Sequence, residues 1–130
     1  MRHVTQLTVR TYECDSYGHV NHAVFVNYLE HARMQHLRAA QFDYDGLIAA
    51  GYFTVIARLN IAYQAPAYAG DELEIETEPI RLRRVSGTVR QTIRRGDTVI
   101  AQAEVHWCVV NTNGQPARPP APFDLRRLAE

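Results

Sequence analysis

The sequence predicts an α+β domain in which one long helix precedes a mainly antiparallel sheet. The apolar residues of segment 24–42 recur with the period of an amphipathic helix. After Gly51 the pattern changes to runs rich in Val, Ile, Thr and aromatic residues, which favour strands. Turn dipeptides such as Gly96-Asp97 separate these runs, as expected for strands joined by hairpins. A helix followed by consecutive hairpin strands is typical of domains with helices on one face of an antiparallel sheet.

Length and composition limit the classes of protein that the chain can represent. Its 130 residues predict one domain, 1–130, and the hydrophobic content of 46% allows a substantial core. No apolar run is long enough to cross a membrane, and we expect no export signal. The formal net charge of zero gives no general attraction to nucleic acid or to an anionic membrane. Two cysteines do not form a disulfide framework, so we expect a cytoplasmic protein.

The first part of the chain predicts a strand, a turn and the helix. Apolar and polar residues alternate roughly over residues 3–14, which predicts a first strand. Asn21 is the expected N-cap of the helix, because its side chain can accept a hydrogen bond from the first turn. The wide apolar arc of the helix predicts that a sheet or an interface covers it. Its main stripe consists of Phe25, Tyr28, Leu29, Ala32, His36, Ala39 and Ala40.

The rest of the chain predicts strands, with a plain connection at 47–51 after the helix. Pro79 indicates a bulge or an edge position, and Gly87 indicates a kink or bulge. The acidic residues of 72–78 and the arginines of 81–95 are expected to form pairs across adjacent strands. The expected elements are strands at 52–63, 72–78 and 99–110, a strand or hairpin at 80–95, and a short terminal helix at 124–130.

The segment 13–22 is the candidate active site. It places a carboxylate, Asp15, and two imidazoles, His19 and His22, directly before the helix. The free N–H groups of a helix start favour negative charge. A carboxylate, an imidazole and preorganised donors are the groups that acyl transfer requires.

The residues that carry a family resemblance lie in two motifs. Residues 15–33 read Asp-Ser-Tyr-Gly-His-Val-Asn-His-Ala-Val-Phe-Val-Asn-Tyr-Leu-Glu-His-Ala-Arg, and residues 63–73 include Tyr-Gln-Ala-Pro and Gly-Asp-Glu-Leu. These motifs resemble those of the hotdog-fold acyl-CoA thioesterases of the 4-hydroxybenzoyl-CoA thioesterase-like group. The resemblance implies a five- to six-stranded antiparallel sheet wrapped around one long central helix. It also implies homodimers or homotetramers with active sites at the subunit interface, an acyl-CoA substrate, and no cofactor or metal.

The resemblance also implies roles for the motif residues. Asp15 either attacks the thioester carbonyl or activates a water. A backbone N–H near His22 and Ala23 polarises the carbonyl, while His22 assists catalysis or orients the substrate. His19 has a structural or supporting role, and direct participation in catalysis is the alternative. We expect the remaining substrate-binding residues within the motifs to be Tyr17, Gly18, Asn21, Ala23 and Tyr63.

Several alternative interpretations compete with this one. Cys14 adjoins Asp15, but strand alternation would direct its side chain to the opposite face. His19 and His22 lack further ligands at metal-site spacing. Arg83 and Arg84 either hold CoA phosphates or belong to the charged pairs of the sheet. The alternative functions are hydrolysis of acyl-acyl carrier protein, non-catalytic binding of acyl-CoA and, less favoured because its motifs are missing, a hotdog dehydratase.

Overall fold

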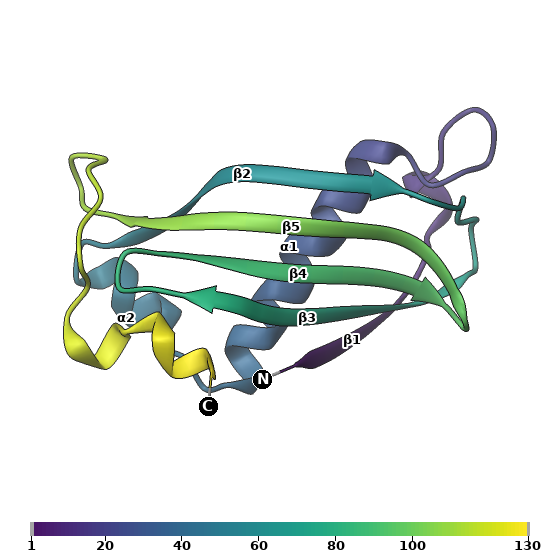
Figure 1. Cartoon of the computed structure of the whole chain (residues 1–130). Coiled ribbons are helices and arrows are strands. Elements are labelled where there is room, and N and C mark those ends of the chain that lie inside the picture. The colour runs from purple at the N-terminus through teal and green to yellow at the C-terminus, as the bar shows by residue number, and fades with distance from the viewer. Residues whose placement is uncertain (1, 130) are drawn as a thin grey trace.

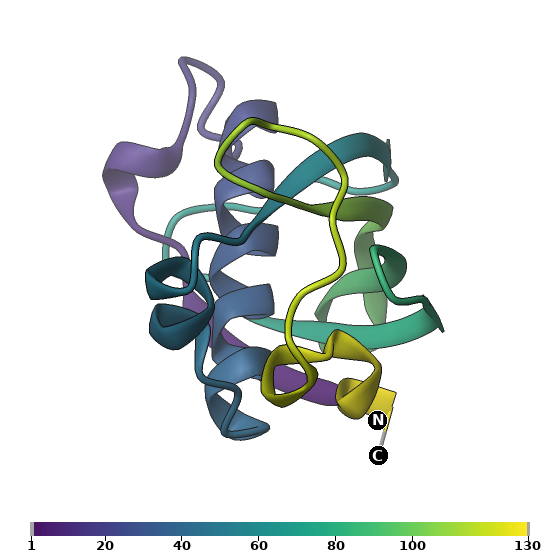
Figure 2. The same ribbon diagram turned by 90° about the vertical axis from the view of Figure 1, so that its left-hand side faces the viewer.

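The computed structural model describes residues 2–129 and places one long helix, α1 (His22–Ala39), across one face of a five-stranded sheet (Figure 1). The strand order is β1-β3-β4-β5-β2, and every neighbouring pair is antiparallel. The sheet curves around the helix when it is viewed from the end (Figure 2). This arrangement confirms the α+β fold and the central helix. The strands are β1 (His3–Thr8), β2 (Phe53–Tyr63), β3 (Glu72–Leu82), β4 (Ser86–Arg95) and β5 (Thr98–Val110).

The core lies between α1 and the concave face of the sheet. The helix buries Phe25, Tyr28, Leu29, Ala32 and His36, so most of the predicted stripe is confirmed. Ala39 is exposed instead, because the helix ends there and Ala40 is its C-cap. The sheet contributes the inward side chains of alternating strand residues, as the pleat requires. These include Leu73, Ile75, Ile93, Ala101, Ala103 and Val105.

The first strand is shorter than predicted. It ends at Thr8, and Thr11–Glu13 form a 3-10 turn rather than a continuation of the strand. The Glu13 backbone N–H donates to the Arg10 carbonyl, while the Glu13 carboxylate accepts from the Arg10 N–H. This reciprocal capping satisfies the backbone N–H groups of Arg10 and Glu13, which in a strand would donate to a neighbouring strand.

Segment 47–51, predicted as a plain connection, belongs mostly to a second helix, α2 (Tyr44–Ala49). The Asp43 side chain caps it by accepting from the Gly46 N–H at 2.9 Å. At the other end of the chain, the predicted terminal helix is a 3-10 helix over Leu125–Ala129, with Glu130 outside the described residues. Its buried residues, Leu125 and Leu128, pack with Trp107.

The two expected irregularities in the hairpin of β3 and β4 have different outcomes. The register shifts between Pro79 and Arg81, which confirms the bulge. Gly87 pairs regularly with Leu82 and Trp107, so the predicted kink there is wrong. A Cβ on Gly87 would lie 2.2 Å from the Trp107 ring, so glycine is needed to make room for the indole.

β2 lies at the edge of the sheet and has β5 as its single neighbour among the described strands. Val55, Ile56 and Tyr63 on this strand are each more than two-fifths exposed. An exposed edge with large apolar side chains is suited to pairing with another chain. Across residues 2–129, no helix combines the length and the hydropathy of a membrane span.

Candidate functional site

The Asp15 loop, the start of α1 and the end of β2 surround one groove. β2 runs to Tyr63 and leads into the segment with Pro66, while the loop approaches from the other side. His19 forms an isolated bridge with Tyr68, and the Val20 N–H donates to the Ala67 carbonyl at 2.8 Å. The fold therefore brings together the two motifs found in the sequence. The groove is lined by Asp15, His19, Val20, His22, Phe25, Tyr63, Gln64, Ala65 and Pro66.

Asp15 is exposed and oriented by its own loop. Its Oδ1 accepts hydrogen bonds from the backbone N–H groups of Tyr17 at 2.9 Å and His19 at 3.2 Å. Its backbone N–H donates to the His19 carbonyl at 2.7 Å, and Gly18 closes the turn with φ +82°. Oδ2 accepts no hydrogen bond from the described residues, so it is available to a substrate or a water molecule.

The helix start provides one free backbone donor, on a residue that lines the same groove as Asp15. The Asn21 side chain accepts from the Ala23 N–H at 2.9 Å, which confirms the predicted N-cap. The Val24 N–H donates to the Asn21 carbonyl. The His22 N–H donates to no described residue. Of the two expected oxyanion donors, Ala23 is therefore already used, whereas His22 remains available.

The two histidines contact different aromatic rings. The His19 ring lies edge-on to Tyr68, with centroids 5.2 Å apart. The His22 ring is exposed and lies edge-on to Tyr63 at 6.5 Å, while the Tyr63 hydroxyl donates to the His22 carbonyl at 2.9 Å. Tyr63 therefore joins the end of β2 to the start of α1 at the groove.

The other predicted site residues are not all brought together. Tyr17, 82% exposed, and Gly18 are on the outer part of the loop and do not line the groove of a single chain. Asn21 and Ala23 contribute through capping rather than as lining residues. Their roles in substrate binding stay predictions.

Arg83 and Arg84 lie at the other end of the sheet from Asp15, in the turn between β3 and β4 (Figure 1). The strand register gives the separation between this turn and the groove. Ser86, at the turn, pairs with Cys108, whereas Ile93 pairs with Ala101, the residue opposite Tyr63. Ser86 and Ile93 are seven residues apart along β4, which at about 3.3 Å per residue places the turn about 23 Å from the level of Tyr63. A CoA at Asp15 would have to span that length or contact these arginines of a second subunit. Cross-strand charge pairing, the competing expectation, is present between Glu76 and Arg94 at 3.2 Å.

Comparison with known proteins decides the family. The sequence profile described as the thioesterase-like superfamily matches residues 9–127. The chain belongs to the thioesterase-like superfamily. The acyl-CoA thioester hydrolase YbgC of Escherichia coli is 36% identical over 100 residues, covering 75% of each chain. A crystal structure of a probable thioesterase from Bartonella henselae superposes with a TM-score of 0.87 at 27% identity, covering 92% of this chain and all of that one.

Another relative of this thioesterase-like protein has a different named donor. The chloroplastic acyl-acyl carrier protein thioesterase ATL3 of Arabidopsis thaliana is 33% identical over 86 residues. The match covers 66% of this chain but 42% of ATL3. The chain thus spans less than half the length of that relative.

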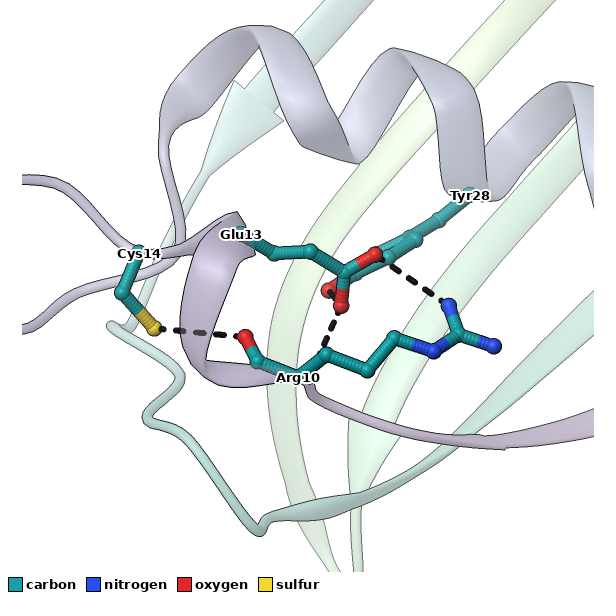
Figure 3. Close-up of polar contacts among 4 residues, drawn as sticks. All are labelled: Arg10, Glu13, Cys14 and Tyr28. Atoms are coloured by element: carbon teal, nitrogen blue, oxygen red, sulfur yellow. Dashed lines mark hydrogen bonds and ion pairs between the residues drawn. The ribbon is translucent and has the colours of Figure 1, made fainter.

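Sequence reasoning missed a polar network that supports the Asp15 loop of this thioesterase-like protein. Glu13 accepts hydrogen bonds from the Tyr28 hydroxyl at 2.8 Å, the Arg10 backbone at 2.8 Å and the Arg10 guanidinium at 3.2 Å (Figure 3). The Asn21 N–H donates to the Glu13 carbonyl at 2.9 Å. The network therefore joins the base of the loop to α1. The spacing of Arg10 and Glu13, three residues apart, was the available signal.

Electrostatics favour the ionised form of Glu13. Burial acts to raise the pKa of Glu13, but the hydrogen bonds from Arg10 and Tyr28 hold it below its ordinary value. Burial and the bond to this carboxylate raise the pKa of the Tyr28 hydroxyl, which remains a donor. Cys14 lies beside this network, with its Sγ 3.9 Å from the Arg10 carbonyl oxygen, and it does not line the groove.

Proposed function

We propose that this protein hydrolyses an acyl-CoA to a free carboxylate and CoA, with Asp15 as the catalytic carboxylate. The observation that carries the proposal is that one groove is lined by both Asp15, which has a free carboxylate oxygen, and His22, which has a free backbone N–H. One group can attack or activate, and the other can donate to a carbonyl oxygen that becomes negative. Family membership and the named activity of YbgC support a thioester hydrolase.

Two routes are consistent with this groove. In the first, an Asp15 oxygen bonds to the thioester carbon and the C–S bond breaks, releasing CoA thiolate and leaving an acyl anhydride that water hydrolyses. In the second, Asp15 removes a proton from a water, whose oxygen bonds to the thioester carbon, and the C–S bond then breaks to release CoA thiolate and the free carboxylate. A thiolate is a good leaving group because the parent thiol has a pKa of about 8.5. Neither route therefore requires a strong general acid.

We also propose that the active form is at least a homodimer that pairs along β2. The exposed side chains of Val55 and Ile56 on an unpaired edge support this assembly. Size measurement by light scattering at micromolar concentration tests it, and an active monomer would contradict it. The cytoplasm is the proposed location, since Cys14 and Cys108 are both free.

The test of function is thiol release from a panel of short-chain, long-chain and aromatic acyl-CoA thioesters. The same acyl groups on acyl carrier protein form the second arm, because ATL3 carries that donor in its name. Hydrolysis of acyl-CoA with competition by free CoA supports the first donor. Hydrolysis confined to acyl carrier protein would favour the alternative, and tight binding of acyl-CoA without thiol release would indicate a non-catalytic binding protein.

A further inference from the structure

A second cavity lies between α1 and the sheet, near the C-terminal end of the helix. It shares no lining residue with the Asp15 groove. From His22 to His36 the helix advances fourteen residues, about 21 Å at 1.5 Å per residue. The cavity is lined by Glu30, Arg33, Met34, His36, Leu37 and Tyr44 of the helical segments, and by Thr54, Ile56, Thr77, Val89, Trp107, Leu125 and Leu128.

Arg33 carries a charge into this cavity, where Glu30 attracts it electrostatically but forms no direct ion pair with it. Its guanidinium donates to the Gln91 Oε1 at 3.0 Å and forms no ion pair with any carboxylate of residues 2–129. Gln91 is fully buried, and its Nε2 donates to the Leu29 carbonyl and to Thr77, so its oxygen is held toward Arg33. Burial lowers the pKa of Arg33, but a guanidinium stays protonated in proteins. The remaining N–H groups are thus preorganised donors.

His36 lines the same cavity, and one of its ring nitrogens has no hydrogen-bond partner within residues 2–129. The residue is 2% exposed, and its Nε2 is buried with no hydrogen-bond partner among the described residues. Its ring stacks on His3 with centroids 5.8 Å apart, which occupies a face of the ring but none of its nitrogens. Buried polar atoms are nearly always hydrogen-bonded in native proteins, so this atom calls for a ligand or a water.

The rest of the lining is mostly apolar. Leu37, Trp107, Leu125 and Leu128 surround a cavity of about 110 Å³. An engineered apolar cavity of about 150 Å³ in another protein binds benzene, so a small hydrocarbon group is the appropriate size here. Glu30 is the one acidic lining residue, and it is exposed on the helix surface.

We propose that this cavity binds a small monocarboxylate, whose carboxylate lies against Arg33 and His36 and whose hydrocarbon part lies among Trp107 and the leucines. A guanidinium fork matches the two carboxylate oxygens, and the charge-assisted bonds are stronger than neutral ones. The Nε2–H tautomer of His36 donates the further bond. The proposed site is a ligand site additional to the groove in which thioester hydrolysis is proposed.

The experiment uses the fluorescence of Trp107, the one tryptophan of the chain. Sodium butyrate is titrated into the whole protein in phosphate buffer, and butyramide serves as the uncharged probe of the same size. We expect a saturable change in emission and a rise in melting temperature with butyrate, and at least about tenfold weaker binding of butyramide. Equal responses to both probes, or no saturable response by either readout, would overturn the proposal.

Variants locate the bound carboxylate. Arg33→Met should weaken butyrate binding about tenfold or more, whereas Arg38→Met, an exposed position on the same helix, should not change it. Asp15→Asn should also bind butyrate like the wild type. Binding that is lost in Asp15→Asn but kept in Arg33→Met would overturn the proposal by assigning butyrate to the groove.

If Arg33→Met does not fold, the comparison of butyrate with butyramide on the wild type decides. Thiol release is measured separately, so failure of the proposed hydrolysis would not be confused with failure of this site.

Discussion

The Tyr63 hydroxyl donates to the main-chain carbonyl of His22 at 2.9 Å, joining the last residue of β2 to the first residue of α1. We expect Tyr63→Phe to lower kcat/KM by about fivefold, because a net hydrogen bond contributes about 1 kcal/mol. Steady-state thiol release measures the effect. Tyr12→Phe is the matched control, since Tyr12 is 80% exposed and outside the groove. Equal effects of the two substitutions would show that the contact has no part in activity.

Asp15→Asn should lower kcat by about a hundredfold or more, the scale expected when a positioned catalytic carboxylate is lost. The melting temperature should change little, because the amide retains an oxygen that can accept from Tyr17 and His19. Asp97→Asn in the hairpin turn between β4 and β5 controls for charge. Near-normal turnover by Asp15→Asn would remove Asp15 from the mechanism.

Glu13→Gln tests whether the network in Figure 3 positions the Asp15 loop. We expect kcat to fall while KM changes little, since Glu13 does not line the groove. Tyr28→Phe removes the same contact from the helix side, so the double variant should lose less than the sum of the two single losses. Strict additivity in the double-mutant cycle would indicate that the two residues act independently.

Arg83→Ala and Arg84→Ala test the CoA phosphate prediction. If these arginines hold the nucleotide, KM should rise for an acyl-CoA but not for an acyl-pantetheine thioester, with kcat unchanged. The effect should weaken with added salt, because exposed charge pairs are screened. Arg118→Ala provides an exposed control. The same loss with both substrates would assign Arg83 and Arg84 to the sheet instead.

His36 should make stability depend on pH. Burial, followed by repulsion from His3, lowers the pKa of His36 below its ordinary value. The unfolded chain therefore binds a proton at a higher pH than the folded chain does. The free energy of unfolding should fall as pH drops below about 6.5.

Urea unfolding at pH 7.5 and 5.5, in buffer without carboxylates, measures this dependence. His36→Gln should reduce the difference between the two pH values, while His31→Gln, at an exposed position of the same helix, should leave it unchanged. Glu30 and Arg33 line the same cavity and are retained in both variants. An unchanged pH dependence in His36→Gln would contradict the prediction.

The sequence by itself determined the elements that have strong local signals. The helical stripe around Phe25 and Leu29 follows from the period of the apolar residues. The Asn21 cap follows from the amide side chain at the helix start, and the Pro79 bulge from the backbone N–H that proline lacks. Each of these signals depends only on residues close together in the sequence. The motif around Asp15 identified the family and the candidate carboxylate. The local sequence pattern gave wrong predictions in two places. At Thr11–Glu13 a capped 3-10 turn replaces the predicted strand, and after Asp43 the helix α2 replaces the predicted connection.

The tertiary structure alone decided which side chains meet. Sequence spacing did not reveal that Gly87 makes room for Trp107 or that Gln91 holds Arg33. Nor did it reveal that His36 has a buried nitrogen with no hydrogen-bond partner in the part of the chain that the structure describes. Each of these relationships joins residues that are far apart in the chain, or depends on what surrounds a side chain. Strand register and helix packing set them, because a side chain's partners in a core are fixed by the whole fold and not by its neighbours in sequence.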